Sequence, residues 1–497
     1  MSETTHATHH TCACCLSRRQ FLGRMSSAVV GALALGDSVG SVFSATDLGE
    51  YIDLASLRPR PRVSVRSVVI RRTPPYWLGW PGTSYDLEGH RQRFTAAFAD
   101  AAERVGVDLT QEQEPLESEE AIGSFAQKLA AHRPDAVLLM LQHLHVWRWL
   151  DPIVNTGVPA IVFAPIGTAF TGQVLGISRR PGVHVISSLE LPAVEQALRM
   201  IRAKHQLEAT RLLVVRGAER QESVLERLGT KVRYIPRRHM HELFAQMPEN
   251  DEVRRVAAAA RDAAKSIVEP TWQDILNAAR AFTTAKRLLR DEDANALTTD
   301  CLGMVSSKVV PTPPCLAASL FQDGGITYGC EADVFGAMSL MLTSYLFDRP
   351  GFMNDPVPET VKNVLIVAHC TAGTRLNGFD TPPEPHILRS HSESDIGVSM
   401  QVLWRVGQPV TLVRFQNPNQ LILDSGTVVA NVDTPPAGGC RTSFQIKMDR
   451  VEDVRDVLGF HQVVSYGDHR RDVEAFCQMW GIKVVNSPER APRGEQA

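Results

Sequence analysis

The sequence predicts an α/β protein with two successive Rossmann-like, doubly wound domains followed by a β-rich, barrel-like C-terminal domain. Three observations carry this prediction. Short apolar runs alternate with helical stretches from residue 62 onward, the alternation restarts near residue 181, and β-rich segments separated by Gly, Pro and Asn replace it after residue 355. The length of 497 residues also exceeds one ordinary domain, since domains usually have roughly 100–200 residues.

The first domain is expected at residues 62–180. Apolar runs of five to eight residues are typical of buried parallel strands, and a longer stretch with helical periodicity is typical of a covering helix. The expected strands are residues 63–70, 135–141 and 159–164, and the expected helix is residues 88–106.

The second domain is expected at residues 181–355, where the same alternation returns. The expected strands are residues 182–187, 211–216, 296–300 and 326–329. The expected helices are residues 191–204, 220–228, 252–266, 271–290, 314–322 and 332–347.

Residues 356–486 are expected to form an antiparallel meander or small barrel. The β-rich segments are residues 408–415, 420–433 and 439–448. A last unit follows, with a strand at 462–466, a helix at 468–480 and a strand at 482–485. The polar tail, residues 487–497, is predicted to be disordered.

The first 45 residues are interpreted as a twin-arginine signal peptide. Arg18 and Arg19 precede an apolar pair, a weakly apolar stretch of residues 25–36 follows, and Ser44-Ala45 is a candidate cleavage point. This order of basic, apolar and small residues is that of a signal peptide. We therefore expect the twin-arginine export machinery as a partner and a periplasmic or extracytoplasmic location. A linker is expected at residues 46–62.

A second pattern lies ahead of the two arginines. The side chains there are His6, His9, His10, Cys12, Cys14 and Cys15. The pattern resembles a soft-metal cluster, but its position upstream of the expected cleavage favours an unusual start of the signal peptide.

Composition favours a small-molecule ligand. Apolar residues make up 44% and charged residues 22% of the chain, and the formal net charge is −3; nothing in this balance indicates nucleic acid. Phosphate-binding, dinucleotide-binding and hydrolase-elbow motifs are missing from the sequence. The six cysteines after residue 300 show no zinc spacing and are interpreted as buried free thiols, although export would allow some of them to oxidise.

Two carboxylates stand at the ends of predicted strands. Glu331 lies between a strand and a helix, and Asp355 follows another short strand 24 residues later (355 − 331 = 24). If these strands are adjacent and parallel, both carboxylates lie at the same sheet edge, where open α/β sheets bind ligands and where two oxygen ligands suit Mn²⁺ or Mg²⁺. The alternative is a helix cap at Glu331 or Asp333 and a turn at Asp355.

Two histidines have similar positions. His461 precedes an apolar strand, and His369 closes one and is followed by Cys370. Either histidine alone is more often structural; His369 is a candidate ligand or substrate donor.

Together, Glu331, Asp355, the His369-Cys370 strand end and the segment from His461 to Gly467 resemble the L-fucose isomerase and L-arabinose isomerase superfamily. The resemblance is best over residues 299–485, and the order of domains also fits. It implies a metal site of Glu331, Asp355 and His461, with His369 as an additional ligand or substrate contact. Arg441 is a further candidate substrate contact. The residue before His461 is Phe460, where both named enzymes tend to have a second histidine.

The resemblance implies a divalent-metal-dependent aldose–ketose isomerase working through an enediol, with Glu331 and Asp355 as catalytic base and acid in either order. It also implies Mn²⁺, or else Mg²⁺ or Co²⁺, as cofactor, a sugar substrate and a homo-oligomer with sites near subunit boundaries. Two alternatives stay open: a non-catalytic exported sugar-binding protein, since two Rossmann-like lobes are also its architecture, and a metal-dependent sugar epimerase using the same enediol.

Overall fold

The computed structural model describes residues 50–77, 86–307, 309–435 and 439–488. The expected signal peptide, the His/Cys pattern within it and residues 489–497 lie outside this part of the chain. No helix in the described part combines the length and the apolar character that crossing a membrane requires. Residues 50–62, within the expected linker, contain the short helix η3 (Leu54–Leu57) and lie against α9 (Trp272–Asp291), where Lys286 donates a hydrogen bond to the carbonyl of Ile52.

The first sheet has five parallel strands in the order β2-β1-β3-β4-β5. Its strands are β1 (Ser64–Ile70), β2 (Asp108–Gln111), β3 (Ala136–Leu141), β4 (Ala160–Ala164) and β5 (Val183–Ser187). Every residue of β3 is buried, which agrees with its continuous apolar sequence. The strand expected at residues 182–187 therefore belongs to the first sheet, because β5 pairs with β4.

Helices alternate with these strands in the chain. They are α2 (Leu87–Val105), α3 (Glu119–His132), α5 (Thr171–Ser178) and α6 (Pro192–Ala209), with the short η4 (Leu144–Leu150) and α4 (Asp151–Val154) after β3. Asp86 caps the start of α2 by accepting a hydrogen bond from the Gly89 amide, and Gly106 ends the helix with φ of 77°. A left-handed glycine of this kind is the commonest way to end a helix.

The second sheet has the order β11-β10-β6-β8-β7. Its strands are β6 (Arg211–Val215), β7 (Gln221–Leu225), β8 (Thr230–Ile235), β10 (Ala296–Thr299) and β11 (Tyr328–Gly329). All pairs are parallel except β7 with β8. The helix expected at residues 220–228 is wrong: this segment is β7, an edge strand whose hairpin pairing with β8 overrides the helical preference of its charged residues.

The helices around the second sheet are α7 (Arg237–Gln246), α8 (Asp251–Ala263), α9, α10 (Cys301–Ser307), α11 (Cys315–Asp323) and α12 (Val334–Phe347). Four of them, α8, α9, α11 and α12, match helices expected from the sequence, whereas α7 and α10 were not expected. Thr271 and Asp274 form a reciprocal capping box at the start of α9, which fixes that boundary.

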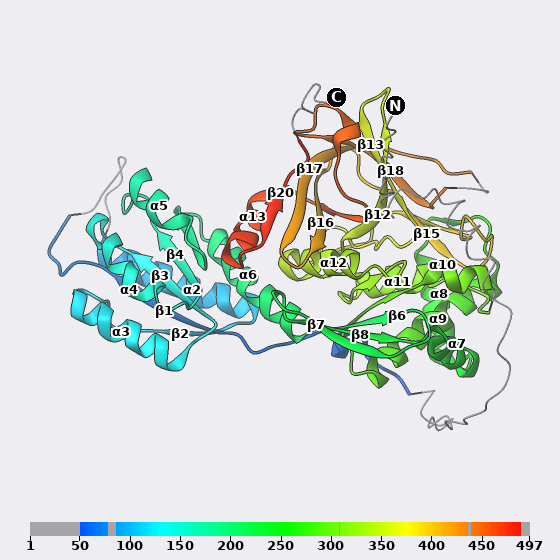
Figure 1. Ribbon diagram of the computed structural model, residues 1–497, viewed down its shortest axis with the longest axis horizontal. Coiled ribbons are helices and arrows are strands. Elements are labelled where there is room, and N and C mark those ends of the chain that lie inside the picture. The colour runs from blue at the N-terminus through cyan, green and yellow to red at the C-terminus, as the bar shows by residue number, and fades with distance from the viewer. Residues whose placement is uncertain (1–49, 78–85, 308, 436–438, 489–497) are drawn as a thin grey trace, which may run out of the picture. The chain divides into compact units, whose positions relative to one another are not determined.

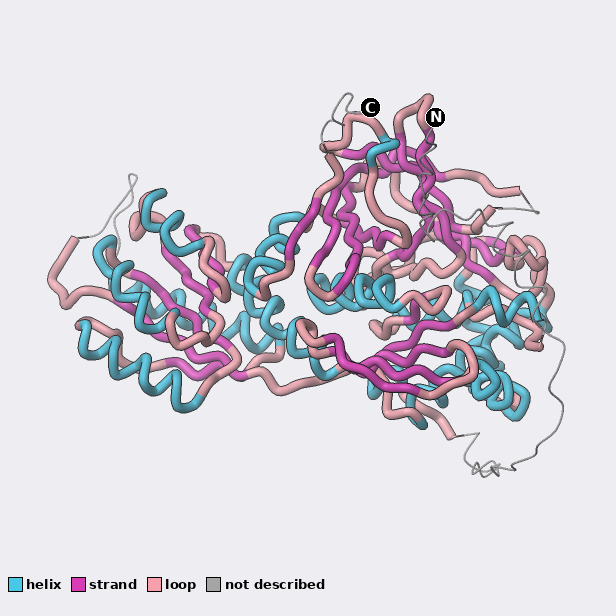
Figure 2. The backbone as a smooth tube through the Cα atoms, in the orientation of Figure 1, coloured by secondary structure: helices cyan, strands magenta, loops and turns pink. Residues whose placement is uncertain are grey.

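The C-terminal domain contains a closed antiparallel barrel. Its strands follow the order β16-β19-β12-β13-β18-β17, and pairing of β16 with β17 closes the ring. Their bounds are β12 (Phe352–Glu359), β13 (Val364–His369), β16 (Pro409–Asn417), β17 (Gln420–Asn431), β18 (Thr442–Met448) and β19 (Gln462–Tyr466). Helix α13 (Arg470–Met479) leads to β20 (Lys483–Val485), which pairs with β17. Figure 2 shows these strands as a group separated by helices from those of the second sheet.

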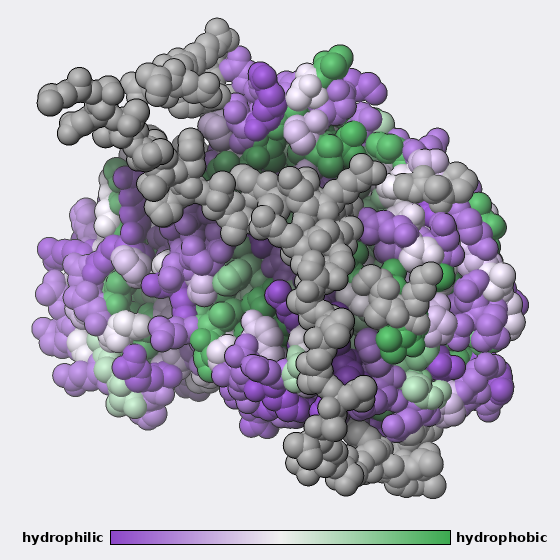
Figure 3. Space-filling view, turned by 45° about the vertical axis from the view of Figure 1, so that its right-hand side comes forward, coloured by the Kyte–Doolittle hydropathy of each residue, from purple (hydrophilic) through white to green (hydrophobic). Residues whose placement is uncertain are grey.

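A small sheet of β14 (His386–Arg389), β15 (Ser399–Val402) and β9 (Ser266–Ile267) completes the fold, and η5 (Val454–Asp456) precedes β19. Beyond β20, the Ser487 amide and hydroxyl each donate a hydrogen bond to the Asp424 carboxylate, and the hydroxyl accepts one from the Leu458 amide. The surface in Figure 3 is mostly hydrophilic, with hydrophobic residues gathered in separate areas.

Helix α12 joins the second sheet to the barrel. It contacts β10 and β11 on one side and β16 and β19 on the other, as Figure 1 shows. Residues 336–347 are all buried, which explains why this helix is apolar all round and has no polar face. The helix therefore holds the end of the second sheet, where Glu331 lies, against the barrel.

We expect Leu342→Ala, at a fully buried position of α12, to lower the free energy of unfolding by about 2–5 kcal/mol, because a cavity would open between sheet and barrel. Urea denaturation measures the change. Leu175→Ala is the matched control, since Leu175 is 57% exposed. Equal effects of the two substitutions would contradict the role given to α12.

Candidate functional site

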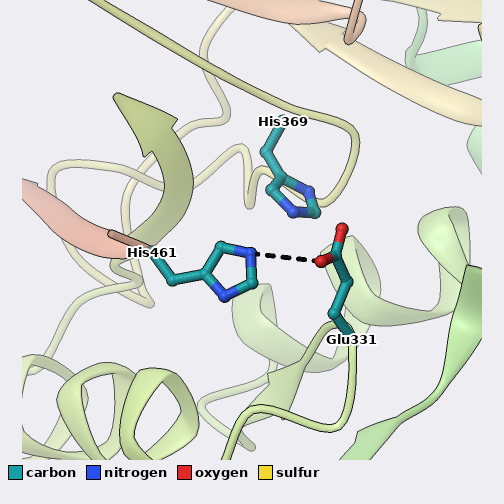
Figure 4. Close-up of side chains that lie close together, drawn as sticks. All are labelled: Glu331, His369 and His461. Atoms are coloured by element: carbon teal, nitrogen blue, oxygen red, sulfur yellow. Dashed lines mark ion pairs between the residues drawn. The ribbon is translucent and has the colours of Figure 1, made fainter. Parts of the chain in front are cut away.

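Four candidate side chains from separate parts of the fold converge beside α12. Glu331 follows β11, Asp355 lies on β12, His369 ends β13 and His461 precedes β19. Figure 4 shows Glu331, His369 and His461 facing one another. The second sheet thus contributes one carboxylate, and the barrel contributes the other three groups.

The turn between β11 and α12 presents Glu331 to the cluster. Glu331 and Ala332 both have left-handed backbones, with φ of 56° and 53°, a conformation that non-glycine residues adopt only under constraint. The Ala332 amide donates to the carbonyl of Thr299, which holds the turn to β10. Asp333 caps α12 through the Gly336 amide. The cap is therefore Asp333, and the Glu331 side chain is left to face the cluster.

Asp355 lies in the cluster, but its strand is not paired in the way that the sequence suggested. Its strand β12 is antiparallel to both neighbours, β13 and β19, and belongs to the barrel. The expectation of adjacent parallel strands is therefore wrong. The two carboxylates come together because α12 packs the barrel against the second sheet, and not because their strands share an edge.

His461 is at the centre of the cluster. Its Nε2 lies 3.3 Å from Asp355 Oδ1 and 3.5 Å from Glu331 Oε2. The His461 side chain is buried, and its backbone is left-handed, with φ of 54°. Glu331, His369 and His461 each offer a ligand atom within 4.8 Å of the others.

Asp333 and Arg414 fix the other side of the His461 ring. His461 Nδ1 lies 2.8 Å from Asp333 Oδ2, and Arg414 Nη1 donates to the same oxygen at 2.7 Å. A ring that donates from Nδ1 to a carboxylate leaves its Nε2 lone pair directed at the cluster. A Cβ on Gly336 would lie 2.9 Å from Arg414 Nη1, so Arg414 needs glycine there to reach Asp333.

When the cluster holds no cation, the electrostatics of this network favour a protonated His461 paired with an ionised Asp333. Burial alone would lower the pKa of His461, but Asp333, Asp355 and Glu331 outweigh it and raise that pKa to about 11. Burial would raise the pKa of Asp333, whereas His461 and Arg414 hold it well below its usual range. His461 is thus cationic at neutral pH, and an incoming metal ion would replace its Nε2 proton.

His369 has a different hydrogen-bond arrangement. Its Nδ1 accepts a hydrogen bond from the Cys370 amide at 2.9 Å, so the neutral ring carries its proton on Nε2. That buried Nε2 has no hydrogen-bond partner within the described part of the chain. The geometry suits a donor to an oxygen atom placed in the cluster better than a metal ligand.

The donor set fits a divalent cation. Glu331 and Asp355, which both approach His461 Nε2, and the His461 imidazole provide oxygen and nitrogen ligands of the kind bound by Mn²⁺, Co²⁺ or Mg²⁺. The group whose ligand atoms all lie within 4.8 Å of one another contains His369 in place of Asp355. A cation would also offset the repulsion between two partly buried carboxylates that approach the same imidazole nitrogen. The inward-facing Nε2 of His461 supports this fit, because without a cation it is buried with no hydrogen bond within the described structure.

Arg441 lies in a different network. Its fully buried guanidinium donates to the Ser390 carbonyl and hydroxyl and to the Pro435 carbonyl. It therefore holds two loops of the barrel domain together. Neither Arg414 nor the bond from Asp333 to His461 was predicted from the sequence; the available indication was that Arg414 is the one charged residue of strand β16.

The fold and the cluster define an α/β protein with a barrel domain and a candidate divalent-metal centre where the two meet. The chain is similar in sequence to sulfoquinovose isomerases. It is 28% identical over 202 residues to that of Clostridium sp. (strain MSTE9), covering 37% of this chain and 44% of that protein. It is 22% identical over 326 residues to that of Priestia megaterium (strain ATCC 12872 / QMB1551), covering 62% of this chain and 70% of that protein.

No protein-family model matches the chain. Among solved structures, a glucose-galactose binding protein from Geobacillus stearothermophilus aligns with 51% of this chain and 84% of its own, at 11% identity and a TM-score of 0.18. A score this low carries no argument about the fold or the ligand.

We expect Asp333→Asn to destabilise the metal-free protein by about 2–4 kcal/mol, because it leaves His461 and Arg414 without their shared counter-charge. Urea denaturation in chelator measures this loss. Asp453→Asn is the matched control, since Asp453 pairs with Arg455 at the surface and such pairs contribute little. A loss no larger than that of the control would contradict the network.

The contribution of His461 to stability should depend on pH. Its folded pKa of about 11 exceeds the unfolded value of about 6.5, so the contribution is complete below about pH 6.5 and is lost as the pH rises toward 11. Asp333 has a lowered pKa, so its contribution is present above about pH 3.9 and is lost as the pH falls.

In metal-free protein, the difference in unfolding free energy between the wild type and His461→Gln should therefore be larger at pH 6 than at pH 9. His132→Gln, at the exposed end of α3, is the control. A difference that stays constant or grows with pH would show that His461 is not the charged partner of Asp333.

Proposed function

We propose that this chain is a divalent-metal-dependent sugar isomerase that interconverts an aldose and a ketose through an enediol. The observation that carries the proposal is the convergence of Glu331 and Asp355 on His461 Nε2, at 3.5 and 3.3 Å. The homology to sulfoquinovose isomerases supports a sugar isomerase independently of this geometry.

The metal ligands in this proposal are Glu331, Asp355 and His461. When bound, the cation would act as a Lewis acid on the oxygens of the open-chain sugar at C1 and C2. Manganese is favoured over magnesium because an imidazole is among the ligands; cobalt is the other candidate. Asp333 would hold His461 in the tautomer that binds a metal. Mutation of a residue that hydrogen-bonds a metal ligand in this way commonly lowers metal affinity by about 10–100-fold.

The two carboxylates carry the proton transfers. One of them removes the proton from C2, and the electron pair of that C–H bond forms the C1–C2 double bond while O1 takes up a proton. The enediol then loses the O2 proton, and C1 receives a proton to give the ketose. Glu331 and Asp355 are the base and the acid of this cycle.

His369 is proposed as a hydrogen-bond donor to a sugar oxygen. Its Nε2 carries the proton, because Nδ1 accepts from the Cys370 amide, and it faces the same space as Glu331 and His461. A fixed donor there would stabilise negative charge that develops on oxygen in the transition state.

The substrate class in the proposal is an open-chain aldose, and sulfoquinovose is the first sugar to assay because the relatives are named for it. We also propose export through the twin-arginine route to the periplasm, on the basis of Arg18 and Arg19, and a homo-oligomer. Secretion of a reporter fused to residues 1–45 and light scattering of the purified protein test these two points.

The decisive experiment compares His461→Gln with His369→Gln in metal content and in isomerase activity. His461→Gln, Glu331→Gln and Asp355→Asn should lose bound Mn²⁺ measured by mass spectrometry of the eluted metal. His369→Gln should keep the metal and lose at least about 100-fold in kcat. Glu226→Gln, at an exposed position, is the control for removal of a carboxylate.

Three other outcomes would each contradict a different part of the proposed function. Wild-type protein that takes up no metal, and gains no thermal stability from added Mn²⁺, would overturn the metal site. Sugar binding without turnover that survives Glu331→Gln would indicate a binding protein. A product that remains an aldose with inverted C2 configuration, seen by NMR, would indicate an epimerase.

A further inference from the structure

A pair of buried thiols lies directly behind the Glu331 turn. Cys301 Sγ and Cys330 Sγ are 2.9 Å apart, and the two residues are 6% and 4% exposed. This separation is longer than a disulfide bond of about 2.05 Å. It is shorter than the ordinary van der Waals contact between two sulfur atoms, so the two Sγ atoms lie close to bonding range.

The strand pairing explains why residues so far apart in sequence meet. Cys301 comes two residues after the last residue of β10, and Cys330 directly follows β11. These strands are parallel neighbours, with Leu297 opposite Tyr328 and Thr298 opposite Gly329. The register therefore fixes the two thiols at the same end of the same strand pair.

The arrangement is suited to a two-thiol reaction and not to a thiolate metal site. A structural zinc site requires four converging ligands. Among the described residues, the only group of three or more His, Cys, Asp or Glu side chains that converge closely is Glu331, His369 and His461. The remaining described cysteines, Cys315, Cys370, Cys440 and Cys477, therefore do not complete a ligand set around Cys301 and Cys330.

We propose that Cys301 and Cys330 form a disulfide that ties the Glu331 turn to the end of β10. A disulfide donor such as oxidised glutathione supplies the oxidant. One thiolate attacks the donor to give a mixed disulfide and releases one donor thiol; the second thiolate attacks the mixed disulfide and releases the other. Two electrons pass to the donor and two protons leave the pair.

The bond would add a covalent link to a turn that hydrogen bonds already hold, among them one from the Thr298 hydroxyl to the Cys330 carbonyl. Glu331 and Ala332 are both left-handed, and the Ala332 amide bonded to Thr299 is the backbone link from this turn to β10. A covalent link at Cys330, the residue before Glu331, restricts the same turn from its other end. The proposal does not depend on the metal centre or on isomerase activity, since the bond and its effect on the turn are measured without substrate.

The test maps disulfides in the whole protein. Reduced protein is incubated natively with oxidised glutathione, and a second sample is refolded in a glutathione buffer of oxidising ratio, so that burial of the thiols cannot prevent the reaction. Both are quenched in acid, alkylated under denaturing conditions and digested. Mass spectrometry should find the Cys301 and Cys330 peptides linked, with the loss of two hydrogen atoms.

Two further measurements follow the bond. The oxidised protein should melt about 2–4 °C higher than the reduced protein, and amides of residues 331–333 should exchange more slowly. Cys301→Ala should abolish both effects, whereas Cys477→Ala, another buried cysteine, should keep them.

The proposal fails if Cys301 and Cys330 are both recovered as free thiols after the two treatments. It also fails if the oxidised link joins other cysteines, or if the exchange of residues 331–333 is unchanged in a protein shown to carry the Cys301–Cys330 bond. Loss of metal binding with this bond intact would count against the proposed function alone.

Discussion

The hydrogen-bonded chain from Arg414 through Asp333 to His461 is the interaction on which the candidate site depends. Asp333 starts α12, Arg414 lies within β16, and His461 introduces β19, so one carboxylate joins three elements of two domains. Taking a guanidinium, a carboxylate and an imidazole out of water is costly unless each is paired. Here each charge has an opposite partner, and the geometry that satisfies them also directs His461 Nε2 at Glu331 and Asp355.

Much of the fold could be predicted from local patterns. Strands β1, β3, β4 and β5 of the first sheet, the long helices α8 and α9 and the final β19-α13-β20 unit are each marked by their own apolar spacing. Strand β2 was not predicted, because its sequence DLTQ has no apolar run. Other failures concern pairing across the sequence. The polar segment Gln221–Leu225 has the pattern of a helix when it is considered without β8, with which it pairs. Nothing in the sequence of Phe352–Glu359 indicates that it will pair with β13 and β19 in a barrel.

The candidate site, like the fold, could be predicted from the sequence only in part. Glu331, Asp355, His369 and His461 could be singled out because each was expected where an apolar strand begins or ends, although Asp355 in fact lies within β12. The proton position on His369 and the partner of His461 could not be predicted, because both depend on hydrogen bonds that exist only in the folded chain. Asp333 resembles an ordinary helix cap, which it is, and its second role requires Arg414 from 81 residues away.

The position of β19 in the barrel has a consequence for the order of events during synthesis. In the sheet this strand lies between β12 and β16, yet in the chain it follows every other strand of the barrel. Until it emerges, β12 and β16 each have an open edge, and the ring cannot close. His461 lies directly before β19, so until that segment is synthesised the chain carries both carboxylates of the cluster without His461. Barrel closure and completion of the proposed metal site would thus be a single late event.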